Sequence, residues 1–392
     1  MDDQVTLIVF AGQGGGTPTE RLVAGAQHAA ARDLIDLGLQ EPLIGHVLLA
    51  TDAPALREAF DHEPRVTVIT DPPGEPFHFG ARLRAIVDRP EVRFPLYFSG
   101  AAAPLIEAST VRDVCVRLLG GSSTVIANNL WSADWFGMVP GSALHRISLP
   151  ESHDNAVPSL LARQAGLTPQ IVDPAIGTIF DLDTPADLTI LALHRGRRTH
   201  VSEFLDGVAL PRERYGATMP FLISQKAHLS LIGRVNTSIW GKAMTDIPGA
   251  KRLFVEERGM VAFGRDTAGE VRSLIGHLYQ QVGPRQFFRI IGDLADAVFF
   301  DSRVLFQHLG LNLTPADRFA SDLGDVDAIA NEVARDFTRA AIEAHVPVIL
   351  GGHGVVAGSL WALTQEAWER ADDGTLPDLP DLPDLPDRPT LA

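Results

Sequence analysis

Short apolar runs alternate with longer segments of helical periodicity through the first half of the chain, and this alternation limits the fold more than any other feature. The runs lie at residues 5–10, 44–50, 66–69, 94–99 and 123–127. Strands that alternate with helices build a three-layer α/β domain around a mostly parallel sheet. Because crossovers in such sheets are right-handed, we expect the loops after the strands to gather along one edge of the sheet.

The second half of the chain predicts a smaller and more helical α/β unit. Its strand-like runs lie at residues 229–235, 252–256, 297–300 and 346–350. A polar stretch at 208–220 separates the two halves, and Leu-Pro-Asp repeats at the end of the chain block helix and sheet. We therefore expect a first domain over 1–200, a linker over 201–225, a second α/β domain over 226–371 and a disordered tail over 372–392.

The formal net charge of −16 excludes nucleic acid and anionic membranes as main partners, because neither polyanion would be attracted to the protein. No apolar run is long enough to cross a bilayer. The only cysteine, Cys115, lies in an apolar helical pattern and is expected to be a small buried hydrophobe. A chain that has no internal disulfide suits a reducing compartment, so we expect a soluble, cytoplasmic protein.

A glycine-rich loop follows the first strand and precedes a helix. It contains Gly12, Gly14, Gly15 and Gly16. Such a loop lets the backbone approach phosphate groups, and the N–H groups at the start of the helix favour negative charge. The spacing matches neither the dinucleotide fingerprint nor the Walker loop, which requires a lysine. The loop therefore indicates either a phosphate site or a flexible turn.

A later stretch brings acidic side chains to the end of an apolar run. We expect residues 170–180 to form a strand near the middle of the sheet, followed closely by Asp181 and Asp183. Thr184 and Asp187 have the spacing of a capping box around a helix that starts with proline. Because a cap needs at most one carboxylate, Asp181 and Asp183 are predicted to be oxygen ligands for Mg²⁺ at a strand end.

The second half has charged residues in loops after predicted strands or before helices, where catalytic groups often lie. They are Asp301, Arg303, Asp317, Arg318, Asp322 and His353. Asp301 ends a buried strand and His353 lies in a glycine loop after another strand, so the two could face one pocket. In the alternative interpretation, the acids at 317 and 322 cap helices and Arg303 forms a salt bridge.

Three features of residues 4–195 together resemble the nucleotidyltransferase fold, and its MobA-like branch in particular. They are the strand, glycine loop and helix at the start, the strand that enters the small-residue turn before Pro104-Leu105, and the sequence Phe-Asp-Leu-Asp-Thr-Pro-Ala-Asp-Leu at 180–188. The branch includes the molybdenum-cofactor nucleotidyltransferases and, more loosely, phospholactate guanylyltransferase. The resemblance implies transfer of a nucleoside monophosphate from an NTP to a small phosphorylated acceptor, with Mg²⁺ as cofactor and pyrophosphate as leaving group.

The resemblance also implies site residues. It puts the phosphate loop at the four glycines, the metal carboxylate at Asp181 or Asp183, and the base or ribose near Gly80. The family has a Pro-Lys pair after the loop, whereas this chain has only Arg21, whose planar guanidinium differs from an ammonium. The family also has an aspartate two residues before the Pro-Leu of the middle turn, where this chain has Ala102.

The residues support three hypotheses about function. The first is a Mg²⁺-dependent nucleotidyltransferase with Arg21, Asp181 and Asp183 as its catalytic groups. The second is a non-catalytic domain that binds a nucleotide, which Ala102 and the missing lysine favour. The third is a phosphate-directed hydrolase in the second half. The preferred base, the acceptor and the oligomeric state stay open in all three.

Overall fold

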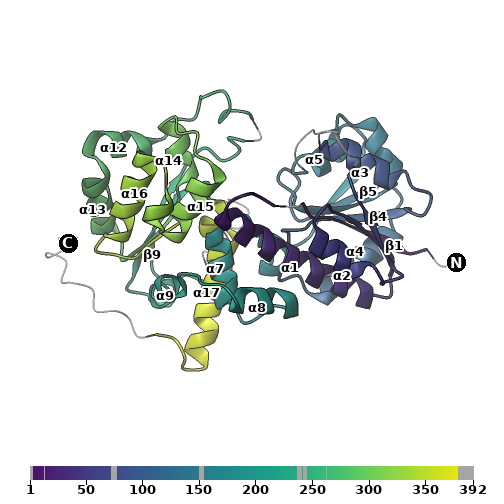
Figure 1. Cartoon of the computed structure of the whole chain (residues 1–392), viewed down its shortest axis with the longest axis horizontal. Coiled ribbons are helices and arrows are strands. Elements are labelled where there is room, and N and C mark those ends of the chain that lie inside the picture. Colours follow the sequence, from purple (N-terminus) through teal and green to yellow (C-terminus); the bar gives the residue numbers. More distant parts are fainter. Residues whose placement is uncertain are drawn as a thin grey trace. The chain divides into compact units, whose positions relative to one another are not determined.

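The computed structural model describes residues 3–12, 14–71, 77–149, 154–235, 241, 245–261 and 263–377, and Figure 1 labels its elements. The chain has a mixed α/β fold with a seven-stranded, mostly parallel sheet and a separate four-stranded parallel sheet. Each sheet belongs to one compact unit. Unit 1 comprises residues 1–15, 24–182 and 197–205, and unit 2 comprises residues 16–23, 183–196 and 206–392.

The sheet of unit 1 has the strand order β3-β2-β1-β4-β6-β5-β7. Its strands are β1 (Val5–Phe10), β2 (Ile44–Ala50), β3 (Val66–Ile69), β4 (Phe94–Ser99), β5 (Thr124–Ala127), β6 (Trp135–Val139) and β7 (Thr168–Ile171). β6 is antiparallel to both of its neighbours, and the other pairs are parallel. Because β2 and β3 lie on one side of β1 and β4 lies on the other, the order of the strands reverses between β1 and β4.

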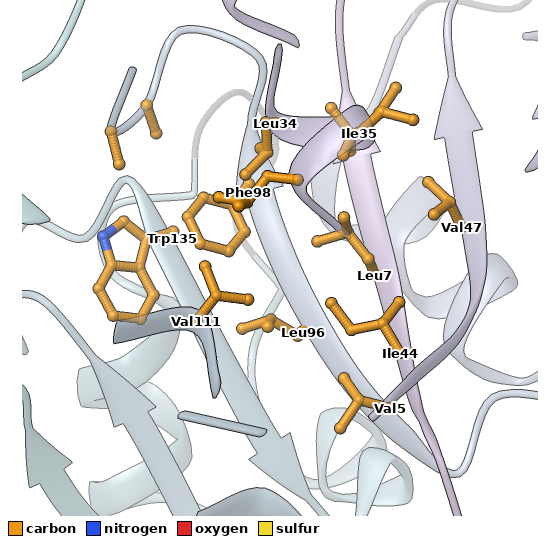
Figure 2. Packing of buried hydrophobic residues seen from close by; sticks show 14 of the residues in the cluster. Val5, Leu7, Leu34, Ile35, Ile44, Val47, Leu96, Phe98, Val111 and Trp135 are labelled. Atoms are coloured by element: carbon orange, nitrogen blue, oxygen red, sulfur yellow. The ribbon is translucent and has the colours of Figure 1, made fainter. Parts of the chain in front are cut away.

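Helices cover both faces of this sheet. They are α1 (Pro18–Gln40), α2 (Pro54–Phe60), α3 (Phe79–Val87), α4 (Ala108–Leu119), η1 (Gly141–Arg146), α5 (Val157–Arg163), α6 (Ile176–Ile179) and α8 (Thr199–Asp206). Side chains of a strand alternate between the two faces. Val5 and Leu7 of β1 therefore pack with residues of α1, α2 and α4, as Figure 2 shows for part of the cluster, whereas Ile8 packs with residues of α3 and α5. Cys115 is buried in the first of these cores, as predicted.

The predicted central strand over residues 170–180 is wrong. β7 ends at Ile171, is the last strand in the sheet order and is mostly exposed, and the short helix α6 follows it. Pro174 has no N–H for a strand ladder. Phe180 and Leu182 are nevertheless buried, at 1% and 0% exposure, so the apolar pattern of this segment came from core packing and not from a strand.

The sheet of unit 2 has the strand order β11-β10-β8-β9. Its strands are β8 (His228–Gly233), β9 (Ala250–Val255), β10 (Ala297–Asp301) and β11 (Val348–Gly351). Helical elements of unit 2 are α7 (Pro185–Leu193), α9 (Arg212–Gly216), α10 (Met219–Ile223), α12 (Leu274–Val282), α13 (Pro284–Leu294), α14 (Arg303–His308), α15 (Pro315–Leu323), η2 (Val326–Ala328), α16 (Glu332–Ile342), η3 (His353–Val356) and α17 (Gly358–Asp372). Ile232, Phe300 and Leu350 pack with residues of α12, α13 and α16 in one core.

The observed units differ from the predicted division of the chain at residues 200, 225 and 371. Residues 183–196 belong to unit 2, where α7 contacts β11 and the Asp187 side chain accepts a hydrogen bond from Ser359. The predicted linker contains α9 and α10, whose Tyr215 and Phe221 are buried. α17 continues through Asp372, while residues 378–392 of the predicted tail lie outside the described residues. Within the described ranges, no helix is both long and apolar enough to span a membrane.

Candidate functional site

The loops after β1 and β4 meet at the edge of the unit 1 sheet where the strand order reverses. The Gly100 N–H donates to the carbonyl oxygen of Phe10 over 2.7 Å, and a Cβ on Gly100 would lie 3.0 Å from the Cβ of Ala11. In open α/β sheets this position, at the carboxyl ends of the strands, is where ligands bind. The residues around these two loops are therefore the candidates for a site in unit 1.

Asp181 lies directly beside the small-residue turn after β4. It forms an isolated antiparallel bridge with Ala102, in which the Leu182 N–H donates to Ala101 over 3.1 Å and the Ala103 N–H donates to Phe180 over 3.0 Å. Ala103 has a φ of 53°, an uncommon conformation for a residue other than glycine, and it belongs to this turn. Asp181 is thus fixed at the carboxyl end of β4 by backbone pairing, although it is not at the end of a central strand.

Two consecutive side chains of α1 hold the glycine loop and the Asp181 segment to the same helix. Gln27 Nε2 donates to the carbonyl oxygen of Leu182 over 2.7 Å. His28 Nε2 donates to the carbonyl oxygen of Gly12 over 2.6 Å. Because Gly12, Leu182 and the Gln27-His28 pair all belong to unit 1, these bonds bring the loop and Asp181 to one place in that unit. Sequence reasoning missed both side chains, since their partners are far away along the chain.

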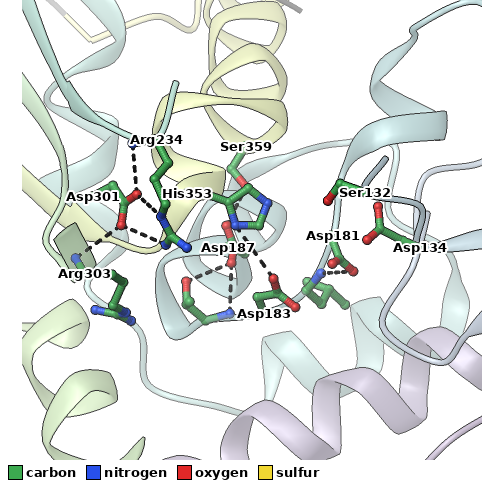
Figure 3. Close-up of polar contacts among 12 residues, drawn as sticks. Ser132, Asp134, Asp181, Asp183, Asp187, Arg234, Asp301, Arg303, His353 and Ser359 are labelled. Carbon is green, nitrogen blue, oxygen red and sulfur yellow. Dashed lines mark hydrogen bonds and ion pairs between the residues drawn. The ribbon is translucent and has the colours of Figure 1, made fainter. Parts of the chain in front are cut away.

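Asp134 is a second acid at this edge that sequence reasoning missed. It comes just before β6, and because β6 runs antiparallel, its start lies at the carboxyl end of β4, where the Ser99 N–H donates to the Asp134 carbonyl. Figure 3 shows the side chains of Asp134 and Asp181 close together. Burial raises the pKa of Tyr97 well above its ordinary value, and the charges of Asp154, Asp134 and Asp181 raise it further, so all three acids lie around this phenol.

The predicted phosphate-loop glycines differ in their surroundings. Gly12 is exposed, and a Cβ there would meet nothing within 4 Å, so the space beside its Cα is open. Gly14 has a φ of 90°, and a Cβ would lie 2.4 Å from the Cβ of Ala24, so this position requires glycine. Gly15 is half-buried, and Gly16 is exposed and belongs to unit 2. Gly80 is buried within the first turn of α3.

The N–H group just before α1 is hydrogen-bonded to a side chain of that helix. The Thr17 N–H and hydroxyl both donate to Glu20, at 3.0 and 2.7 Å, and these bonds lower the pKa of Glu20. Arg21 is exposed, and its guanidinium donates to the carbonyl oxygen of Gly16. The Thr17 N–H is therefore already satisfied, and Thr17, Glu20 and Arg21 all belong to unit 2.

A Mg²⁺ ion fits the acids of unit 1. This ion needs only one or two protein carboxylates when substrate phosphates and water supply its remaining ligands. Asp181 and Asp134 provide two such carboxylates at the sheet edge. In the part of the chain that the structure describes, no three His, Cys, Asp or Glu side chains are grouped so that they could hold a metal. The donor set therefore suits an ion that arrives with a phosphate ligand and not a closed protein cage.

Asp183, the other predicted metal ligand, belongs to unit 2. Its Oδ2 lies 3.9 Å from His353 Nδ1, and both side chains line a cavity of about 460 Å³. Burial lowers the pKa of His353, and the charge of Asp183 opposes this shift. The predicted capping box next to Asp183 is confirmed, because the Thr184 N–H and hydroxyl donate to Asp187 over 2.9 and 2.7 Å. Burial raises the pKa of Asp187 to about 7.

Asp301 does not line this cavity, and its carboxylate is bonded to Arg234, which does (Figure 3). Its side chain is fully buried and accepts from Nε, Nη2 and N of Arg234 at 2.6, 3.0 and 3.1 Å, and from the Arg303 N–H at 3.2 Å. Burial alone would raise the pKa of Asp301, but the charge and hydrogen bonds of Arg234 outweigh burial and lower it. Asp301 is thus a structural anion that fixes an arginine.

Among the other predicted residues of the second half, Asp322 and Asp317 also accept hydrogen bonds from nearby groups. Arg303 binds the buried carboxylate of Asp322 with two hydrogen bonds of 2.9 and 2.5 Å, and it lines the cavity. Asp317 follows the capping residue Thr314, and its carboxylate accepts from the Ala330 N–H over 2.6 Å, away from the cavity. Of the predicted residues, Arg303, Arg318 and His353 line the cavity.

No protein-family model and no curated protein matches this chain. Solved structures that are similar include a nucleotidyl transferase from Methanothermobacter thermautotroptrophicus (15% identity, 53% of this chain and 100% of that chain, TM-score 0.38). Others are a cytidylyltransferase from Leptospira borgpetersenii (12%, 53% and 99%, 0.37) and Rv0371C of Mycobacterium tuberculosis in complex with manganese (19%, 48% and 96%, 0.31). At these identities and TM-scores the similarities carry no argument about the chemistry of this chain.

Proposed function

We propose that unit 1 binds a nucleoside triphosphate with Mg²⁺ and transfers the nucleoside monophosphate to a small phosphorylated acceptor, as the resemblance to MobA-like enzymes implies. The observation that carries the proposal is the pair of bonds from Gln27 and His28, which gather Gly12 and the Asp181 segment at one sheet edge. A phosphate-binding loop and a metal carboxylate that act on one triphosphate have to lie at the same edge of the sheet.

Each group at the edge has a defined task in this proposal. The open backbone of Gly12, with Gly14 holding the turn, accepts the phosphates. Arg21, which stands where the family has its lysine, belongs to unit 2. Asp181 and Asp134 hold Mg²⁺, which neutralises charge on the phosphates. Asp134 replaces the acid that is missing at Ala102, since both positions lie at the carboxyl end of β4.

The reaction is a displacement at phosphorus. An oxygen of the phosphorylated acceptor forms a bond to the α-phosphorus, and the bond from that phosphorus to the bridging oxygen of the β-phosphate breaks. The electron pair leaves with pyrophosphate, whose negative charge the loop N–H groups stabilise. No redox step or further co-reactant is needed.

The test is release of pyrophosphate by the full chain with Mg²⁺, each of the four NTPs and a panel of phosphorylated acceptors. Asp181→Asn should lower the rate at least about 100-fold, the size expected when a group that stabilises transition-state charge is removed. Asp113→Asn is the matched control, because this exposed acid of α4 pairs only with Arg117 among the described residues. No pyrophosphate from any combination would contradict the transfer reaction.

Ala102 and the lack of lysine in the loop favour one other function, which is nucleotide binding without turnover. Calorimetry separates the two. Binding of an NTP that weakens in Asp181→Asn, together with no pyrophosphate release, would select the non-catalytic function. If no NTP binds to the unchanged protein, the nucleotide site itself is wrong.

A further inference from the structure

The cavity of unit 2 lies at the position in its sheet where ligands bind. Its walls include Arg234 after β8, Arg303 after β10, and Gly352 and His353 after β11. β9 lies on one side of β8 and β10 lies on the other, so the strand order reverses between β8 and β10. The carboxyl ends of strands at such a reversal form the ligand crevice of open parallel sheets. A volume of about 460 Å³ also falls within the range of small-molecule sites, about 300–1,000 Å³.

Two arginines of the cavity wall are fixed in place by buried carboxylates. Asp301 binds Nε and Nη2 of Arg234, and Asp322 binds both Nη atoms of Arg303, and neither carboxylate lines the cavity. Each guanidinium has five N–H donors in a rigid fork, so donors remain beyond those that the buried acids use. The arginines are therefore oriented before any ligand arrives, which reduces the entropy lost on binding.

A third arginine of the wall, Arg318, has no such acid. It lies on α15, is half-buried, and its guanidinium makes no hydrogen bond or ion pair with any residue that the structure describes. Burial lowers the pKa of Arg318, and the nearby positive charge of Arg303 lowers it further, while the charge of Asp322 opposes this shift. A half-buried cation next to two others is unfavourable by itself, and an anion in the cavity would relieve it.

The rest of the lining indicates what the anion is attached to. Val261, Leu313 and Phe319 provide apolar surface, whereas Asp183 and Asp266 add two carboxylates to the wall. These acids would repel a ligand that is negative along its whole length. They accept hydrogen bonds from hydroxyl groups, so the ligand should have its charge at one end and an uncharged body.

We propose that this cavity is a binding site for an organic phosphate monoester, with the phosphate at Arg318, Arg234 and Arg303 and an uncharged, partly apolar body against Leu313 and Phe319. Arginine forks match the oxygens of a phosphate in pairs. Every residue in the lining of this cavity belongs to unit 2.

Calorimetry on the full chain tests the site with phenyl phosphate and inorganic phosphate as probes. Phenyl phosphate should bind more tightly than inorganic phosphate, because only its ring contacts the apolar wall. Arg318→Gln should weaken phenyl phosphate about tenfold or more, the change expected from loss of a charge-assisted hydrogen bond. Arg339→Gln is the matched control, since this arginine of α16 carries the same charge, pairs with Asp336 and does not line the cavity.

A second pair of probes tests the role of the two acids. Glycerol 3-phosphate and 3-phosphoglycerate have the same three-carbon chain, but the latter has a carboxylate in its body, and it should bind more weakly. Equal binding of the two would overturn the selection by Asp183 and Asp266. Unchanged binding of phenyl phosphate in Arg318→Gln, or no binding to the unchanged protein, would overturn the site.

The two proposals fail separately. Asp181→Asn should leave the affinity for phenyl phosphate unchanged, because Asp181 belongs to unit 1. Loss of that affinity in Asp181→Asn would place the probe in unit 1 and overturn the inference about unit 2.

Discussion

Replacing Asp301 by asparagine should destabilise unit 2 strongly. The Asp301 side chain has 0% exposure and the Arg234 side chain 17%, and the carboxylate accepts four hydrogen bonds. Asparagine has nearly the same shape but removes the charge and replaces one acceptor oxygen with a donor. Removing one partner of a buried ion pair costs about 3–5 kcal/mol. Since water reaches part of Arg234, we expect the free energy of unfolding to fall by about 3 kcal/mol.

The assay is urea unfolding followed by far-UV circular dichroism and tryptophan fluorescence, with the free energy of unfolding of unit 2 as the readout. Asp183→Asn is the comparison variant. The Asp183 side chain is 46% exposed and 3.9 Å from His353, so its loss should cost less than about 1 kcal/mol. If Asp301→Asn were no more destabilising than Asp183→Asn, the view of Asp301 as the anion that holds Arg234 would be refuted.

Two further predictions concern stability. Gly233→Ala should lower the unfolding free energy by at least about 2 kcal/mol, because Gly233 has a φ of 123° and the new Cβ would lie 2.5 Å from the Cβ of Asp301. Gly216→Ala, where the space is open, should leave the stability unchanged. Thermal melts compare the two variants, and equal melting temperatures of Gly233→Ala and Gly216→Ala would contradict this reasoning. Because burial raises the pKa of Asp187 to about 7, the folded state keeps a proton that the unfolded chain releases near pH 4, so stability should fall as pH rises from about 4 to 7. Asp187→Asn should flatten that slope in urea titrations across the same pH range, and an unchanged slope would show that other groups cause it.

Local patterns in the sequence predicted local structure well. The Thr184–Asp187 capping box formed because its hydrogen bonds join residues three apart, and β1, β2, β4, β5, β8, β10 and β11 formed at predicted apolar runs that are largely buried. The segment 170–180 failed because Phe180 is buried without a strand ladder. Hydrophobicity reports burial, and it cannot by itself identify the kind of element that is buried.

The candidate sites depend on contacts between distant residues, which a single sequence does not reveal. Asp134 reaches the edge of the unit 1 sheet because β6 runs antiparallel, and that short strand was not predicted. Gln27 contacts Leu182, 155 residues away, and Arg234 owes its orientation to Asp301, 67 residues away. The sequence suggested that Asp301 faces a pocket. In the structure Asp301 instead binds Arg234, and Arg234 lines the cavity.

The most direct test of the nucleotide site is an anomalous difference map from crystals soaked with Mn²⁺ and a non-hydrolysable NTP analogue. Mn²⁺ takes the same oxygen ligands as Mg²⁺ and is visible by its anomalous scattering. The account predicts a peak at coordinating distance, about 2.0–2.2 Å, from a carboxylate oxygen of Asp181, with the phosphates against Gly12. A peak elsewhere, or phosphates away from the loop after β1, would contradict it.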